Sequence, residues 1–213
     1  MAVGCFAGYR LLTTGYYLLM DAIILDNIPF EINTEDLLRR MRVAADSADA
    51  ATIERMVEDA VALGRPKGIY GTAYIESRSD ETVVIDGVTF ASRVLRVNLD
   101  KPERVFPFLA TCGAELQAWS EGFSDMLEYY WADVIKEMAL RTASKAIIEH
   151  LKAHNNPGKM SSMSPGSLED WPITEQEPMF NLLGSAAESI GVRLTDSFLM
   201  IPNKSLSGIN FPT

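Results

Sequence analysis

The longest regular pattern in the sequence is an apolar repeat of helical spacing that extends from Ser124 to about Leu151. Large apolar side chains recur three or four residues apart, which predicts one amphipathic helix of about eight turns. Asn155-Asn156-Pro157-Gly158 follows and is typical of a helix end. A helix of this length would span a small domain, so the rest of the chain has to be arranged around it.

Strand patterns occupy the region before this helix. Residues 68–90 alternate apolar and polar side chains, and Asp86-Gly87 within them is a strong hairpin signal. Residues 104–111 are apolar around Pro107, which favours a strand end or an edge strand because proline cannot donate to a ladder. Residues 92–99 suit either a strand or a short helix.

Two shorter helices are predicted nearer the N-terminus. Asn33 is typical of a helix cap, and a second helix spans about Asp49 to Leu63. A short apolar run, Ala22–Leu25, precedes both and is predicted to be a strand. Helices and strands are therefore segregated along the chain. This favours an α+β domain with an antiparallel sheet.

The length is compatible with a single domain. The 213 residues are 47% hydrophobic, which is ample material for a core, and we assign residues 21–213 to one domain. Residues 1–20 are apolar, but their one basic residue, Arg10, lies in the middle, and the apolar run is interrupted. Neither a signal peptide nor a membrane span is indicated. This segment is either an N-terminal extension or the first element of the domain.

Acidic residues outnumber basic residues. There are 29 Asp and Glu against 19 Lys and Arg, which gives a net charge of −10. Nucleic acids and anionic membranes would repel such a chain, so we expect neither as a partner. The two cysteines, Cys5 and Cys112, are too few for a disulfide framework. A reduced, cytoplasmic location is the expectation.

Few residues form a pattern that carries chemistry. His150 and His154 have metal-ligand spacing, but no acid or cysteine completes a site, so we interpret them as cations near a helix C-terminus. Cys112 precedes a helix without an assignable histidine partner, which favours a small buried residue. The sequence has no nucleotide-binding motif and no nucleophile elbow. We predict no metal site and no catalytic residue, and composition and spacing leave the function open.

The last quarter of the chain carries an ordered series of motifs. They are Ser-Pro-Gly at 164–166, Trp171-Pro172, Ile190-Gly191-Val192, the apolar run at 194–202 and a Ser-x-Ser-Gly turn at 205–208. This series resembles the activation, or reactivation, domain of cobalamin-dependent methionine synthase, where a Pro-Gly-Tyr loop precedes an "IG…LTES…M.P..S.SG" block. The resemblance covers most of the chain after Met20.

The resemblance implies both a fold and a role. Members of the family have a curved antiparallel sheet flanked by helices. Their domain binds S-adenosylmethionine and docks on the cobalamin domain, where it positions the reactants for reductive remethylation of cob(II)alamin. This chain contains no cobalamin domain. The resemblance therefore implies a stand-alone module that is not a complete enzyme, with cobalamin supplied by a corrinoid protein or methyltransferase subunit.

Site residues follow from the same motifs. S-adenosylmethionine contacts are expected from Ser162, Ser164, Pro165, Gly166, Ser167 and Asp170. A partner or its cofactor is expected to face Trp171, Ser205, Ser207 and Gly208. Backbone at Pro165-Gly166 would approach the ligand closely, and the Asp170 carboxylate would favour its sulfonium. The family has arginine at the position of Ser162 and tyrosine at that of Ser167.

The sequence leaves two alternatives for the function. A module of the same fold can bind a corrinoid protein or a small molecule without using S-adenosylmethionine. An unrelated enzyme can use the same scaffold, because fold does not fix function. For Trp171, packing in the core is the alternative to a ligand contact.

Overall fold

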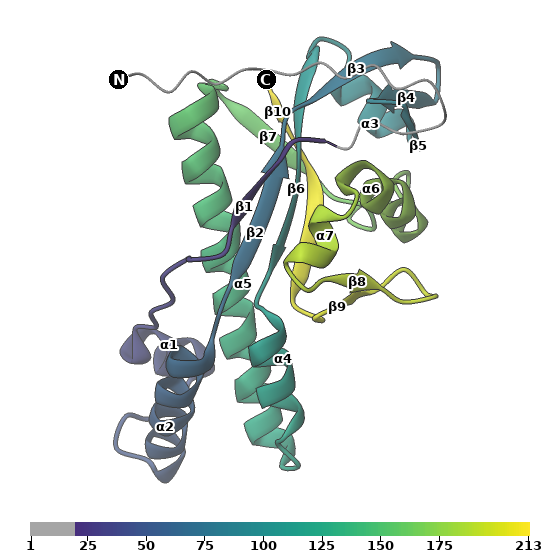
Figure 1. The fold of residues 1–213 in the computed structure, drawn as a ribbon. Helices are drawn as coiled ribbons and strands as arrows, with labels where there is room; N and C mark the ends of the chain where they lie inside the picture. Colours follow the sequence, from purple (N-terminus) through teal and green to yellow (C-terminus); the bar gives the residue numbers. More distant parts are fainter. Residues whose placement is uncertain (1–19) are drawn as a thin grey trace.

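An antiparallel sheet forms the centre of the computed structural model, which describes residues 20–213 (Figure 1). Its strands are β1 (Ala22–Leu25), β2 (Lys67–Gly71), β3 (Ala73–Arg78), β4 (Thr82–Ile85), β5 (Val88–Ala91), β6 (Arg104–Thr111), β7 (Met160–Met163) and β10 (Ser205–Pro212). Strand β6 pairs with β2 and β3 along one edge and with β10 along the other, and β7 adds to the outer edge of β10.

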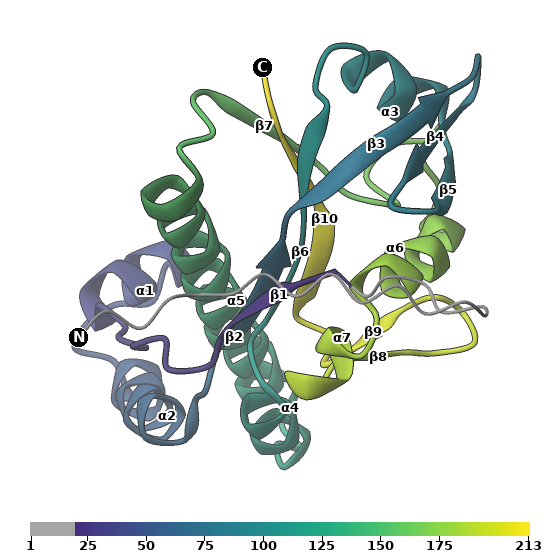
Figure 2. The ribbon, with the colours of Figure 1, turned by 45° about the horizontal axis from the view of Figure 1, so that its top comes forward.

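Helices cover both faces of this sheet. They are α1 (Thr34–Met41), α2 (Ala48–Leu63), α3 (Arg93–Asn98), α4 (Ala114–Glu121), α5 (Met126–Asn155), α6 (Gln176–Leu183) and α7 (Ala186–Ser189), with a 3-10 turn, η1 (Ile173–Glu175), before α6. Figure 2 shows α5 along one face and α6 and α7 on the other. The predicted α+β class with an antiparallel sheet flanked by helices is confirmed.

Local sequence signals account for the helix boundaries. The Asn33, Ser47 and Ser92 side chains each accept a hydrogen bond from a backbone N–H in the first turn of α1, α2 and α3. Helix α5 is capped by Asp125 instead of Ser124, because the Asp125 carboxylate accepts the N–H groups of both Leu127 and Glu128. Residues 92–99, left open between strand and helix, contain α3.

The prediction that residues 104–111 form a strand end or edge is wrong. Strand β6 is the central strand, and all of its residues except Arg104 are buried. It tolerates Pro107 because β2 stops pairing at Tyr70 and β3 resumes the same register at Ala73. Pro107 lies opposite this interruption, so its missing N–H removes no bond from that ladder.

The Ser-x-Ser-Gly segment is not a turn. Residues 205–208 begin β10, which pairs with β6 over its first six residues and with β7 at its end. The apolar run before it folds as a separate two-stranded hairpin of β8 (Arg193–Leu194) and β9 (Met200–Ile201). Serine and glycine favour turns locally, but here two neighbouring strands satisfy the backbone hydrogen bonds.

Apolar residues form three packed clusters. One lies between the sheet and α6–α7 and includes Trp171, Ile209 and Phe211. A second lies under the C-terminal half of α5, where Ile147 and Leu151 pack on the other face of the sheet. The third joins α1, α2 and α4 to the N-terminal half of α5. Within residues 20–213, no helix has the length and apolar character that a membrane span requires. The predictions for residues 1–19 lie outside the described residues.

Candidate functional site

The segment from Ser162 to Pro172 places most of the sequence-predicted site residues together. Ser162 is exposed on β7, opposite Asn210 of β10. Residues 164–172, which we call the β7 loop, then leave the sheet. Ser164 is partly buried and Pro165 is buried, whereas Gly166 and Ser167 are exposed. The exposed residues of this segment are therefore Ser162 and residues 166–170, which include the two acids Glu169 and Asp170.

The β7 loop is held by its own hydrogen bonds. Gly166 N–H donates to the Trp171 carbonyl at 2.7 Å, and Ser167 N–H donates to the Ser164 carbonyl at 3.2 Å. Gly166 has a φ of +82°, in the region that favours glycine, and a side chain there would also meet Ile173. Two of the backbone donors expected to hold a ligand are thus used inside the loop. The Ser167 hydroxyl also donates inside the loop, to the Ser164 carbonyl at 2.5 Å, so it can only accept a hydrogen bond from a ligand. The Ser162 hydroxyl lies on the exposed edge.

Asp170 has a structural role in this conformation. Its carboxylate accepts the Val94 N–H at 2.7 Å and the Ser92 hydroxyl at 3.1 Å, so it caps α3 from a distant part of the chain. These bonds, led by the Val94 N–H, lower the pKa of Asp170. Glu175 makes a similar contact, because its carboxylate accepts the Ala91 N–H at 3.0 Å. Asp170 therefore fastens the end of the β7 loop to α3, and Glu175 fastens η1 to β5.

We expect Asp170→Asn to change stability in a pH-dependent way. Because the folded-state pKa is depressed, the charged carboxylate stabilises the fold above its unfolded pKa, and this contribution is lost as pH falls through the folded pKa. Melting temperatures should be lower for the variant at neutral pH, and the difference should shrink below about pH 4. Glu169→Gln, at the exposed neighbouring acid, is the control. A difference independent of pH would contradict this account.

Three residues expected to face a partner are buried. Trp171 is fully buried against Phe90, with an edge-to-face ring contact at 6.3 Å, so core packing is its role in this conformation. The Ser207 hydroxyl donates to the Gln176 side-chain oxygen at 2.5 Å inside the core. Gly208 is buried because Met163 and Ser164 of the neighbouring chain segment pass directly over it. None of these three can contact a partner without a rearrangement of the core.

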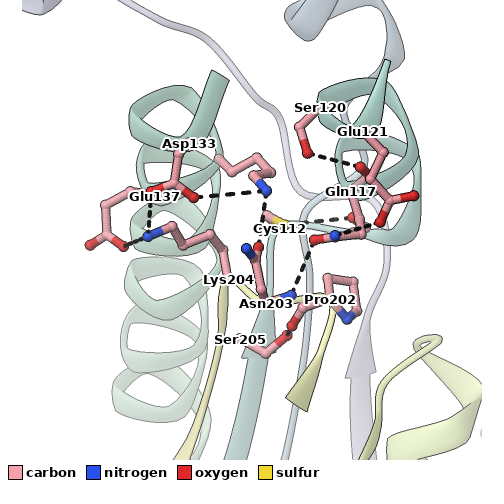
Figure 3. A network of polar contacts seen from close by, with 12 residues as sticks. Cys112, Gln117, Ser120, Glu121, Asp133, Glu137, Pro202, Asn203, Lys204 and Ser205 are labelled. Carbon is pink, nitrogen blue, oxygen red and sulfur yellow. Dashed lines mark hydrogen bonds and ion pairs between the residues drawn. The ribbon is translucent and has the colours of Figure 1, made fainter. Parts of the chain in front are cut away.

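Ser205 belongs to a polar network around the connection from β9 to β10 (Figure 3). Its hydroxyl is hydrogen-bonded to the Pro202 carbonyl at 2.8 Å and to the Thr111 hydroxyl at 2.9 Å. In the same connection Asn203 N–H donates to Gln117 of α4, and Lys204 pairs with Asp133 of α5 at 2.9 Å. The network fixes the start of β10 to both helices, which makes Ser205 a structural residue here.

A fully buried lysine lies beneath this connection. Lys136 donates to the Asn203 side-chain oxygen at 3.0 Å, and the Asp133 carboxylate is 3.8 Å away. Burial lowers the pKa of Lys136, although Asp133 opposes this shift. The periodicity of α5 gave no sign that a charged residue would occupy a core position.

Cys112 is inert at neutral pH by the same physical argument. Burial raises the pKa of its thiol to about 12, so the thiolate that reacts with alkylating reagents is essentially absent. In a Cys5→Ser background, we expect Cys112 to remain unlabelled by iodoacetamide at pH 8 in the folded protein and to label fully in denaturant. Mass spectrometry measures both. Rapid labelling under native conditions would contradict the buried position.

A groove on α5 was missed by sequence reasoning. It lies between the β1–α1 connection and the C-terminal half of α5, has a volume of about 540 Å³, and combines apolar walls with Asp26, Glu149, His150 and His154. We call it the α5 groove. The buried Tyr70 hydroxyl hydrogen-bonds to His150 Nδ1 at 2.8 Å. Burial is the main cause that lowers the pKa of His150, and the charge of the neighbouring His154 lowers it further.

The two histidines show no metal-site geometry. Their rings stack at 3.9 Å, and His154 Nδ1 bonds to the His150 carbonyl. No cluster of three or more His, Cys, Asp or Glu side chains arranged for a metal ion occurs among residues 20–213. The spacing of the two histidines therefore marked this part of α5, but they line a largely apolar groove and do not form a metal site.

Comparison with solved structures finds the same fold in another protein. The crystal structure of the MetH reactivation domain bound to AdoHcy matches with a TM-score of 0.61, over 92% of this chain and 79% of that chain, at 16% sequence identity. At this identity the match shows the fold alone, and the fold expected from the resemblance is confirmed. No family model matches the sequence, and no curated protein matches it.

Proposed function

We propose that this chain is a reactivation module that binds S-adenosylmethionine at the Ser162–Ser167 edge and docks on a corrinoid protein. The observation that carries the proposal is the fold shared with a reactivation domain that binds AdoHcy, a related ligand. The β7 loop supports it, because its polar edge is exposed while Pro165 and the hydrogen bonds inside the loop hold its shape. The corrinoid would be supplied by the partner, together with its methyl-transfer chemistry.

The site fits this ligand in part. Exposed serine hydroxyls at 162 and 167 can hydrogen-bond to the polar groups of the methionine or ribose. Asp170 does not supply a free counter-charge, since it caps α3. Ligand recognition then depends on hydrogen bonds without an ion pair, and we expect an affinity weaker than that of a site with arginine at position 162.

Calorimetry with S-adenosylmethionine tests this proposal. We expect binding at sub-millimolar to millimolar ligand, and Ser162→Ala with Ser167→Ala should weaken it about tenfold or more through two lost hydrogen bonds. Ser189→Ala, at an exposed serine on α7, is the control. Absence of binding at millimolar ligand would remove S-adenosylmethionine from the proposal. Failure to bind a corrinoid protein in any cobalt state would remove the docking role.

The α5 groove supports a second candidate, a binding module for another small molecule. Ligand sites are usually concave, with apolar walls and a few polar groups, and the groove has this character. Asp26 and Glu149 on its rim favour a cationic ligand. Asp26→Asn separates the candidates. If this variant loses S-adenosylmethionine binding and the serine variants do not, the ligand lies in the groove.

A further inference from the structure

The end of the molecule formed by α4 and the start of α5 exposes an unusual amount of apolar surface. Met126 is 86% exposed, Tyr130 53%, Leu127 47% and Tyr129 44%. At 100° per residue these side chains fall within roughly 160° of the helix circumference, so they share one face. Trp131, Ala132 and Ile135 occupy the opposite face and pack into the core. The exposed face is therefore the side of α5 that residues 20–213 leave uncovered.

Two aromatic residues of α4 and the turn after it pack against the core cluster that α4 shares with α5. Trp119 and Phe123 are partly buried and pack edge to face at 5.0 Å. We call the exposed face formed by Met126, Leu127, Tyr129 and Tyr130 at this end of the molecule the α4–α5 tip. Figure 1 shows α4 and the N-terminal end of α5 extending past the end of the sheet. Tyrosine, tryptophan and methionine are the residues enriched at protein interfaces.

The sequence around the α4–α5 tip is acidic. Residues 105–135 contain no lysine or arginine and five acids, which are Glu115, Glu121, Asp125, Glu128 and Asp133. Glu121 and Asp125 are exposed beside the apolar face. Asp133 is paired with Lys204 and Glu115 with Lys67, whereas Glu121 and Asp125 have no lysine or arginine partner among residues 20–213. The tip thus combines an apolar centre with an anionic rim.

We propose that the α4–α5 tip binds a basic amphipathic helix of a partner protein. An apolar helix face would cover Met126 and Tyr130, and lysine or arginine side chains beside it would meet the acidic rim. A second copy of the chain would bring two anionic rims together, and an anionic membrane would be repelled by the same charge. The tip lies at the opposite end of α5 from β7, so the proposal does not depend on the S-adenosylmethionine site.

A model peptide tests the proposal directly. The probe is a fluorescent 14-residue amphipathic peptide of leucine and lysine, and the measurement is fluorescence anisotropy against the whole chain. The variant Met126→Ser with Tyr130→Ser removes apolar area and leaves the charge unchanged, so we expect it to weaken binding about tenfold or more. Glu121→Gln should weaken binding and flatten its salt dependence. A leucine–glutamate peptide should not bind.

Controls distinguish this surface from non-specific attraction. Leu63→Ser with Val97→Ser changes two apolar residues of comparable exposure on α2 and α3, 48% and 58%, and should leave peptide affinity unchanged. Circular dichroism verifies that each variant folds. Equal affinity for the wild-type chain and the Met126→Ser, Tyr130→Ser variant would overturn the proposal. The wild-type chain can also be tested for a dimer by sedimentation equilibrium. If it forms a dimer and the Met126→Ser, Tyr130→Ser variant does not, the α4–α5 tip binds a second copy of the chain, and the proposal is overturned.

Discussion

Replacing Ser162 with arginine and Ser167 with tyrosine is expected to raise the affinity for S-adenosylmethionine about a hundredfold. An arginine at position 162 would pair with the ligand carboxylate, and a tyrosine at 167 would add a stacking surface. Each contact is worth about 1–3 kcal/mol, and together they give the expected change in Kd. Both positions are exposed, so the larger side chains need no repacking. Calorimetry measures the dissociation constant of each variant.

A matched variant tests whether the gain in affinity depends on the position of the added arginine. Ser161→Arg adds the same charge to the neighbouring residue of β7, whose side chain points to the other face of the sheet. It should leave the affinity unchanged within about twofold, since only long-range electrostatics would act. Unchanged affinity in Ser162→Arg with Ser167→Tyr would show that the ligand does not lie at the Ser162–Ser167 edge. The α5 groove would then be the remaining concave site described above.

Gly208→Ala is expected to destabilise the fold by about 3 kcal/mol or more. A Cβ at this position would collide with the Met163 carbonyl and lie 2.7 Å from Ser164 Oγ and 3.0 Å from the Phe108 ring. The carbonyl belongs to backbone at the end of β7 and cannot move without separating β7 from β10. Denaturant unfolding measures the loss, and the affinity for S-adenosylmethionine should fall with it because β7 carries Ser162.

Gly158→Ala is the control for this substitution. Gly158 has a φ of +72°, but a Cβ there has no heavy atom within 4 Å among the described residues. Its expected cost is about 1 kcal/mol, from backbone strain alone. Equal destabilisation by the two alanines would mean that the close approach of β7 to β10 is not what requires glycine at position 208.

Much of the fold could be predicted because its signals are local. The cap at Asn33, the helix to Leu63 and the end of α5 at Asn155 follow from side chains that satisfy or block nearby backbone groups. The hairpin at Asp86-Gly87 joins β4 to β5, with Asp86 and Gly87 both at positive φ. Each of these depends on residues a few positions apart, so no tertiary information was needed.

The sheet order could not be predicted in the same way. Pro107 favoured an edge position, and only the interruption between β2 and β3 explains why β6 can be central. The serines and glycine at 205–208 favoured a turn, yet β6 and β7 hold them extended. Pairing between strands a hundred residues apart is decided by packing of the whole sheet, which local preferences do not encode.

The same distinction between local and tertiary information applies to the candidate site. The sequence by itself determined the α+β class, the long helix and the loop at Pro165-Gly166, because these follow from periodicity and from backbone freedom. Only the tertiary structure decided that Asp170 caps α3, that Trp171 and Ser207 are buried, and that Asp26 and His150 line one groove. The physical reason is that burial and hydrogen-bond partners depend on which distant segments meet, and the residue type alone does not specify them.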